Sequence, residues 1–188
     1  MFQITYPVLA AIISILWILV RFYCFKKSKI FSWKREAQLM LVYICIVVVV
    51  RFTFFPFFKV DGRIPPLVFD PATVFPLRLN FVPLVNLFDY EIFKELLINV
   101  IGNTAMFLPL GIVWPSVFKE LNTHGKVIGA GIGCSLLIEI LQLPFFDRVS
   151  DVDDLILNTL GCVIGYGILT LCRRCKRKAL LQDSKILR

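Results

Sequence analysis

The sequence predicts an all-α integral membrane protein, a bundle of about five transmembrane helices with a long proline-rich extracellular connection. Of its 188 residues, 58% are hydrophobic, and the mean hydropathy of +0.79 is far above that of a soluble globular domain. The apolar residues form five runs, each close to the ~20 residues that a helix needs to cross ~30 Å of hydrocarbon. The runs cover residues 5–25, 37–58, 97–115, 127–144 and 154–172.

The first run is expected to stay in the protein as a membrane anchor. No Lys or Arg precedes it and the basic residues follow it, which reverses the charge order of a secretory signal peptide. We therefore expect a single membrane domain over residues 1–188, ending in a basic tail at residues 173–188.

Basic residues predict how the bundle is oriented. They gather between the first and second runs, between the third and fourth runs, and in the tail. Because Lys and Arg accumulate on the cytoplasmic side of a membrane, we expect the N-terminus outside and the C-terminus in the cytoplasm. The net charge of +8 then reflects topology and provides a surface for anionic lipid headgroups. The tail has no folded element that would read nucleic acid.

The connection at residues 59–96 is expected to form an irregular extracellular layer. It contains five prolines, at positions 65, 66, 71, 76 and 83, and proline removes backbone donors and disfavours pairing in a sheet. Its hydrophobic residues favour a position on the bilayer surface, where it would cover the bundle as a cap. Residues 89–96 are expected to form a short interfacial helix that leads into the third span.

Polar side chains recur near the outer ends of four predicted helices. They are Arg51 in the second helix, Asn99 and Asn103 in the third, Glu139 and Gln142 in the fourth, and Asp154 and Asn158 in the fifth. A carboxylate in hydrocarbon costs ~2.5 to 3.5 kcal/mol even on lenient scales, so Glu139 is expected to face a polar partner, a cavity or a ligand. We therefore expect a shared polar pocket that opens to the exterior. One alternative is that these side chains only cap helices or snorkel to the membrane surface. Another is that Glu139 and Arg51 form a purely structural ion pair.

Small residues predict which helices pack closely. Two sets have the four-residue spacing that lets helices approach in lipid: Gly125, Gly129 and Gly133, and Gly161 with Gly165. We expect close contact between the fourth and fifth helices, which would bring Glu139 and Asn158 together.

The cysteines and the one histidine do not predict a metal site. Cys172 and Cys175 have a CxxC spacing, but they stand in the basic tail without a second pair or a nearby histidine. We expect the six cysteines to be free thiols and His124 to lie in a solvated turn.

Three segments resemble the VanZ-like family, which is named for a teicoplanin-resistance membrane protein. They are NVIGNTAMFLPLGIVWP from Asn99, IEILQ from Ile138, and DRVSDVDDLILNTLGCVIGY from Asp147. Upstream, RLNFVPLVNL from Arg78 is similar to that family's loop motif before the third helix. The likeness covers about residues 78–166, whereas residues 1–77 match only in being hydrophobic and helical. It implies a small membrane protein of the bacterial cell envelope, with a VanZ-like core at about residues 78–172.

The resemblance also selects individual residues. Matched onto this chain, the pattern falls on Asn99, Asn103, Pro109, Gly111, Glu139, Gln142, Arg148, Asp151, Asp154, Asn158 and Gly161. Arg148 and Arg51 carry guanidinium groups suited to a phosphate or carboxylate, and Glu139 with Asp154 is a candidate acid–base pair. Oxygens such as those of Asp151, Asp154 and Asn158 are also of the kind that hold a divalent cation, although we assign no metal ligand.

Three kinds of function are compatible with these residues. The first is binding or modification of an amphiphilic envelope ligand, such as a lipid-linked cell-wall precursor or a lipoglycopeptide, which would contribute to teicoplanin-type resistance. The second is an enzyme that acts on lipid-linked phosphate or acyl groups through Glu139 and the aspartates. The third is a structural or transport role, although no internal repeat suggests a secondary transporter. We expect membrane lipids as partners; the sequence specifies neither a cofactor nor an oligomeric state.

Overall fold

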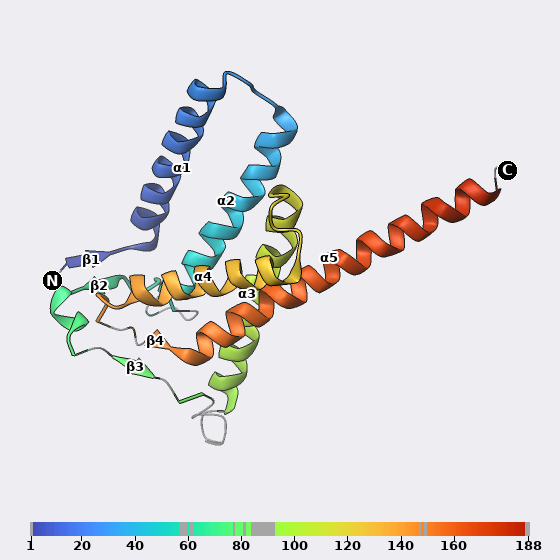
Figure 1. Ribbon diagram of the computed structural model, residues 1–188. Coiled ribbons are helices and arrows are strands. Elements are labelled where there is room, and N and C mark those ends of the chain that lie inside the picture. The colour runs from blue at the N-terminus through green and yellow to red at the C-terminus, as the bar shows by residue number, and fades with distance from the viewer. Residues whose placement is uncertain are drawn as a thin grey trace.

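The fold was taken from a computed structural model (Figure 1), which describes residues 2–56, 60, 62–76, 78–80, 82–83, 93–146, 148 and 150–186, without the side chains of residues 95 and 183–186. Within these ranges the chain forms five long helices: α1 (Tyr6–Ser28), α2 (Trp33–Phe54), α3 (Phe93–Val117), α4 (His124–Gln142) and α5 (Val152–Ile186). All five are long and apolar enough to cross a membrane. The predicted all-α, multi-pass membrane architecture is confirmed.

The closest helix contact joins α3 and α5. A Cβ added at Gly161 would clash with the backbone carbonyl of Thr104, and one at Gly165 would clash with that of Leu108. Gly111 of α3 meets the backbone of α5 in the same way, at Cys162. The two backbones therefore touch directly, as small residues allow in membrane helices, and Figure 1 shows the two helices crossing there.

The prediction that Gly125, Gly129 and Gly133 pack α4 against α5 is wrong. A Cβ at Gly125, Gly129 or Gly133 would meet only open space, because these glycines point away from the neighbouring helices. Instead α4 reaches α5 through Gly131, where an added Cβ would lie 3.1 Å from the Cβ of Cys162. The small residues of α5 were correctly singled out, but they pack chiefly on α3.

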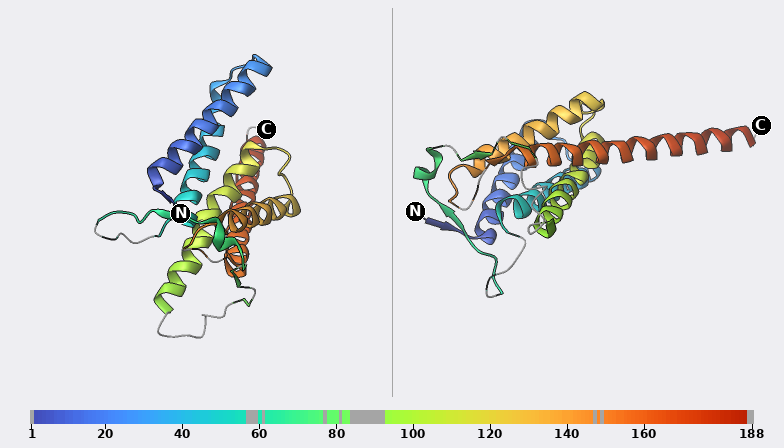
Figure 2. Two further views of the ribbon diagram at one scale, coloured as in Figure 1. Left: turned by 90° about the vertical axis from the view of Figure 1, so that its left-hand side faces the viewer. Right: turned by 90° about the horizontal axis from the view of Figure 1, so that it is seen from below.

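Apolar side chains from α2 to α5 form the core. Phe55, just after α2, and Phe107 of α3 are fully buried, and Leu110 and Cys162 are nearly so. By contrast, α1 contributes no buried residue and lies along α2 at the edge of the bundle, as Figures 1 and 2 show. The core therefore positions the ends of α2, α3, α4 and α5 relative to one another.

Short strands close one end of the bundle. Strand β1 (Phe2–Ile4) pairs antiparallel with β2 (Leu67–Phe69), and β3 (Leu79–Asn80) pairs parallel with β4 (Ser150–Asp151). A 3₁₀ helix, η1 (Pro71–Val74), lies between β2 and β3 in the sequence. We call this the polar end; there α2 and α4 end and α3 and α5 begin (Figure 1).

The expectation of a wholly irregular connection is therefore wrong at these strands. Strands β2 and β3 lie in two of the proline-free segments, residues 67–70 and 77–82, and each pairs with a segment outside the connection. Of the interfacial helix expected at residues 89–96, residues 93–96 are the start of α3; residues 89–92 lie outside the described ranges.

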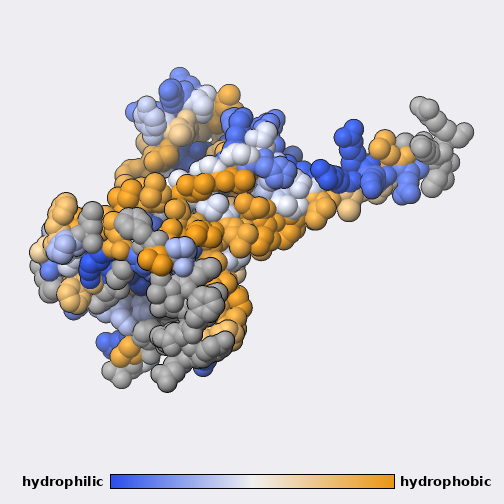
Figure 3. Space-filling model, turned by 60° about the horizontal axis from the view of Figure 1, so that its bottom comes forward, coloured by the Kyte–Doolittle hydropathy of each residue, from blue (hydrophilic) through white to orange (hydrophobic). Residues whose placement is uncertain are grey.

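The opposite end, which we call the basic end, holds the α1–α2 loop, the α3–α4 loop and the continuation of α5. Helix α5 does not end at residue 172 as expected but continues to Ile186 and projects away from the bundle (Figures 1 and 2). Figure 3 shows hydrophobic residues covering the middle of the bundle and hydrophilic residues along the projecting helix. His124 is exposed, but it is the first residue of α4 rather than a turn residue, and its ring packs edge-on against Tyr166.

Candidate functional site

Glu139 lies inside the protein near the end of α4. Only 7% of it is exposed, and its Oε2 accepts a hydrogen bond from the backbone N–H of Asp151 at 3.2 Å. The Ser150 hydroxyl donates to the backbone carbonyl of Glu139 at 3.0 Å. Strand β4 is thus fastened to α4 around this carboxylate, and the hydrogen bonds offset part of the cost of burying it.

Asp151 links β4 to the neighbouring strand β3. Its Oδ2 accepts a hydrogen bond from the Asn80 amide at 3.0 Å, and its Oδ1 accepts one from the backbone N–H of Asp153 at 2.9 Å. The backbone of Ser150 also donates to the carbonyl of Arg78 at 3.1 Å. Strand β3 is therefore held beside β4 by both backbone and side chains.

A second carboxylate, Asp154, joins α5 to α3. The Asn103 amide nitrogen donates to Asp154 Oδ1 and also to Asn99 Oδ1, the latter at 2.6 Å. Asn103 is buried, whereas Asn99 is exposed. Asp154 is close enough to Glu139 for their charges to interact. We call Glu139, Asp151 and Asp154, with Asn80, Asn99 and Asn103, the carboxylate cluster.

Gln142 and Arg148 hold the end of α2. The Gln142 amide donates to the carbonyl of Thr53 at 2.7 Å, and Arg148 Nη2 donates to the carbonyl of Phe54 at 2.7 Å. The last carbonyls of a helix have no partner within the helix, so these two side chains serve as its cap. Arg148 also lies near enough to Asp154 for their charges to interact.

Arg51 is not brought to Glu139, and the structural ion pair considered from the sequence does not form. Arg51 Nη1 instead donates to the carbonyls of Phe55 and Pro56, at 3.2 and 3.1 Å. Its guanidinium also lies over the rings of Tyr6 and Phe52. Placed in the last turn of α2, Arg51 reaches forward to the backbone carbonyls just beyond the end of its own helix.

Asn158 lies one turn further along α5 than Asp154. It is 1% exposed, and its amide donates to the Ser135 hydroxyl of α4 at 3.0 Å rather than to Glu139. Within the described residues its Oδ1 has no hydrogen-bond partner. The expected meeting of Asn158 with Glu139 is thus replaced by a contact one turn away on α4.

The carboxylate cluster is satisfied by neutral donors, namely amide side chains and backbone N–H groups. Its accessible members are Asn99, which is exposed, and Asn80, Asp151 and Asp154, which are partly exposed. Within the part of the chain that the structure describes, no group of three His, Cys, Asp or Glu side chains is placed to hold a metal ion. The arrangement offers hydrogen-bond acceptors beside a guanidinium, at the rim of the bundle.

Sequence reasoning missed Asn80 and Ser150, which hold β3 and β4 around the carboxylates. Asn80 was visible as the amide in the RLNF loop motif, but its partner Asp151 lies far away in the sequence.

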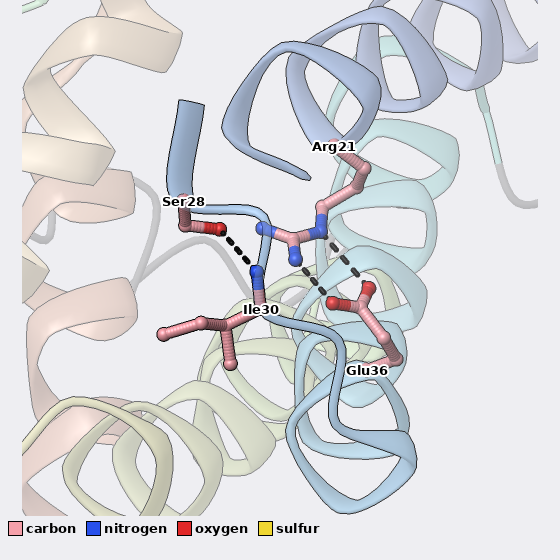
Figure 4. A network of polar contacts seen from close by, with 4 residues as sticks. All are labelled: Arg21, Ser28, Ile30 and Glu36. Atoms are coloured by element: carbon pink, nitrogen blue, oxygen red, sulfur yellow. Dashed lines mark hydrogen bonds and ion pairs between the residues drawn. The ribbon is translucent and has the colours of Figure 1, made fainter. Parts of the chain in front are cut away.

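Sequence reasoning also missed an ion pair at the basic end. There Arg21 of α1 donates through Nε to Glu36 of α2 at 3.0 Å and through Nη2 to the other carboxylate oxygen (Figure 4). The available signal was one arginine within the first apolar run and one glutamate within a basic segment.

Two cavities flank that ion pair. One measures about 380 Å³ and the other about 450 Å³, and Arg21, Phe25 and Glu36 line both. They lie at the basic end, away from the carboxylate cluster.

These features define a multi-pass membrane protein with one buried and two partly exposed carboxylates at one end of a glycine-packed helix bundle. Within that class, the chain belongs to the VanZ/LLP1 family, whose model matches residues 40–173. The match begins in α2 and so extends further toward the N-terminus than the motif-bearing residues 78–166. Comparisons with curated proteins and with solved structures give no match.

Proposed function

We propose that this VanZ/LLP1 protein binds an amphiphilic envelope ligand at its polar end, facing the outside of a bacterial cell membrane. The observation that carries the proposal is the carboxylate cluster, in which Glu139 and Asp154 from two helices are held by Asn103 and by the backbone of β4. Intramembrane carboxylates are costly and mark sites of function by default.

The chemistry of the cluster favours a ligand rich in hydroxyl and amide groups. Carboxylates held by neutral amide donors can exchange those donors for the O–H and N–H groups of a sugar or peptide. Arg148, near Asp154, suits a phosphate or carboxylate on the same ligand. A lipid-linked cell-wall precursor or a lipoglycopeptide combines such groups with a hydrocarbon chain that the surrounding bilayer would accept.

Such binding would contribute to resistance against teicoplanin-type antibiotics by engaging either the drug or its target. Cells that express the protein are expected to be less susceptible than cells without it. Glu139→Gln keeps an acceptor for the Asp151 N–H but removes the charge, and Arg148→Lys removes the planar guanidinium. Both should abolish the protection at unchanged protein level.

The matched control is Gly129→Ala, which changes α4 where an added Cβ meets open space. It should protect as well as the wild type. Equal protection by Glu139→Gln, Arg148→Lys and the wild type would leave the polar-site proposal without support.

The proposed orientation places the N-terminus outside and the basic tail in the cytoplasm, in agreement with the distribution of Lys and Arg. Cys172 and Cys175 are exposed near the basic end, and Ala72 in η1 is exposed at the polar end. In intact cells, a membrane-impermeant maleimide should label Ala72→Cys in a cysteine-free background. With only Cys172 and Cys175 restored to that background, it should label them only after permeabilisation, and the reverse pattern would contradict the orientation.

The second candidate is an enzyme that acts on lipid-linked phosphate or acyl groups. Its support is the proximity of two buried or partly buried carboxylates, Glu139 and Asp154, whose charges interact. Two such groups can share acid and base roles. Release of phosphate or of a modified lipid from labelled wall precursor, abolished by Glu139→Gln, would favour catalysis, whereas binding alone predicts an unchanged precursor.

A further inference from the structure

The α1–α2 hairpin contains two cavities that meet at one ion pair. One is lined by both polar and apolar side chains, and we call it the polar cavity; the other is the apolar cavity. Arg21 and Glu36 line both, and each side chain is only about a quarter exposed, at 25% and 29%. This site lies at the basic end, on the opposite side of the bundle from the carboxylate cluster.

The polar cavity, of about 380 Å³, offers donors suited to an anion. Arg21 uses Nε and Nη2 for Glu36, and Figure 4 shows the remaining guanidinium nitrogen pointing toward the loop at Ser28 and Ile30, which lines the cavity. Arg35 binds the carbonyl of Val117 through Nη1 at 2.6 Å and also lines the cavity.

The start of α2 adds to this set. Ser32, the N-cap residue, lines the same cavity and makes no capping hydrogen bond through its hydroxyl. The N–H groups of a first helical turn, together with the helix dipole, favour an anion at such a position. The cavity thus combines two arginines, two serine hydroxyls and a helix start.

The second cavity, of about 450 Å³, is almost entirely apolar. Besides the ion pair, it is lined by Trp17, Ile18, Phe22, Phe25, Phe31 and Met40. Phe22 and Phe31 are more than half exposed, and α1 has no buried residue, so this wall faces the surroundings of the bundle. Such a wall suits a hydrocarbon chain that lies along α1.

We propose that the α1–α2 hairpin binds one anionic phospholipid of the adjacent leaflet. Its phosphate lies in the polar cavity between Arg21 and Arg35, and an acyl chain lies in the apolar one. The charge of the surroundings matches this occupant, because Lys26 and Lys27 lie in the last turn of α1 and Lys29 follows directly after it. Glu36 is the acidic residue among the lining groups, and Arg21 already neutralises it.

The test uses the full-length protein, purified in detergent and stripped of lipid. Native mass spectrometry follows the binding of phosphatidylglycerol and of phosphatidylcholine at increasing lipid concentration. Phosphatidylglycerol is expected to bind at least about fivefold more tightly, and Arg35→Gln should remove about that factor. Arg174→Gln, which deletes the same charge from an exposed position of α5 near the same end, should leave the affinity unchanged.

Glu36→Gln separates a lipid site from a merely structural pair. It removes the negative charge from the cavity, so a lipid site predicts tighter binding of phosphatidylglycerol. A structural pair predicts weaker or unchanged binding, because the hairpin loosens without any gain for the anion.

Excess glycerol 3-phosphate, which carries the anionic group without acyl chains, should not displace the lipid. The proposal is overturned if Arg35→Gln and Arg174→Gln bind phosphatidylglycerol equally well, or if Glu36→Gln fails to strengthen binding. Displacement by glycerol 3-phosphate would also overturn it, in favour of a soluble anion.

Discussion

The α3–α5 contact and the α1–α2 contact hold their helices together in different ways. At Gly161 and Gly165, α5 touches the backbone of α3 directly, and the same pair of helices carries the hydrogen bond between Asn103 and Asp154. In contrast, α1 meets α2 through side chains: the hydroxyls of Ser14 and Tyr43, 2.6 Å apart, and the Arg21–Glu36 pair.

This difference explains where the molecule is fixed and where it has room. A backbone contact leaves no side chain to adjust, so Asp154 of α5 keeps its position relative to Asn103 of α3. Contacts between long side chains leave space between helices, and the two cavities lie there. The comparison predicts that substitutions in the first contact cost far more stability than substitutions in the second.

The largest effect is expected from Gly165→Ala. The added Cβ would clash with the backbone carbonyl of Leu108, which cannot move without separating α3 from α5. Overpacking of this kind costs about 1 to 3 kcal/mol, and we expect the upper part of that range because the obstacle is backbone. The midpoint of thermal unfolding in detergent measures the loss.

Gly129→Ala is the control for that change. Its Cβ meets only open space, and alanine is preferred to glycine inside a helix by up to ~1 kcal/mol. It should be neutral or slightly stabilising. If both variants shift the midpoint by the same amount, the backbone contact does not determine stability.

A smaller effect is expected from Asn103→Ala. It removes the buried amide that holds the partly exposed Asp154, and a hydrogen bond to a charged group contributes about 1.5 to 3 kcal/mol. Asn99→Ala removes the exposed partner of the same amide and should cost less than about 1 kcal/mol. Chemical denaturation of the two purified variants compares these costs; the opposite order would show that Asn103 does not link the two helices.

The smallest effect is expected from the Arg21–Glu36 pair. Partly exposed ion pairs typically contribute about 0 to 1 kcal/mol. A double-mutant cycle with Arg21→Gln and Glu36→Gln, read from unfolding midpoints, should give a coupling energy in that range. A coupling above ~3 kcal/mol would instead make α1–α2 as rigid a contact as α3–α5.

Much of the fold was predictable because hydrocarbon imposes a simple length rule on apolar segments. The five runs correspond to the five helices, and their boundaries shift by only a few residues except in α5. There the basic residues after 172 continue the helix, because Arg, Lys, Ala and Leu are good helix formers outside a membrane as well as inside it. The glycine spacing of α5 correctly indicated a packing face, but spacing alone does not identify the helix that packs on it.

The sequence predicted at which end of the bundle the residues of the carboxylate cluster lie, but not which residues form hydrogen bonds with each other. Depth along each helix placed Asn103, Glu139 and Asp154 near one end, and the structure brings Asn103 to Asp154. The partners of Glu139 and Asp151 come from β4 and from Asn80 of β3. These contacts depend on how the connection folds back over the bundle, and hydrophobic periodicity does not describe a segment that is not a helix. For the same reason, the turn of Arg51 toward its own helix end was not foreseen.

The most direct test of the proposed ligand site is a comparison of the lipids that copurify with the protein from bacterial membranes. Mass spectrometry of the extracts from wild type, Glu139→Gln and Gly129→Ala measures the enrichment of each amphiphile over the bulk membrane. We expect one envelope amphiphile to be enriched with the wild type and with Gly129→Ala. Its enrichment should fall at least about tenfold with Glu139→Gln, as expected for the loss of a charged hydrogen bond. Equal lipid profiles in all three extracts would contradict the proposed site.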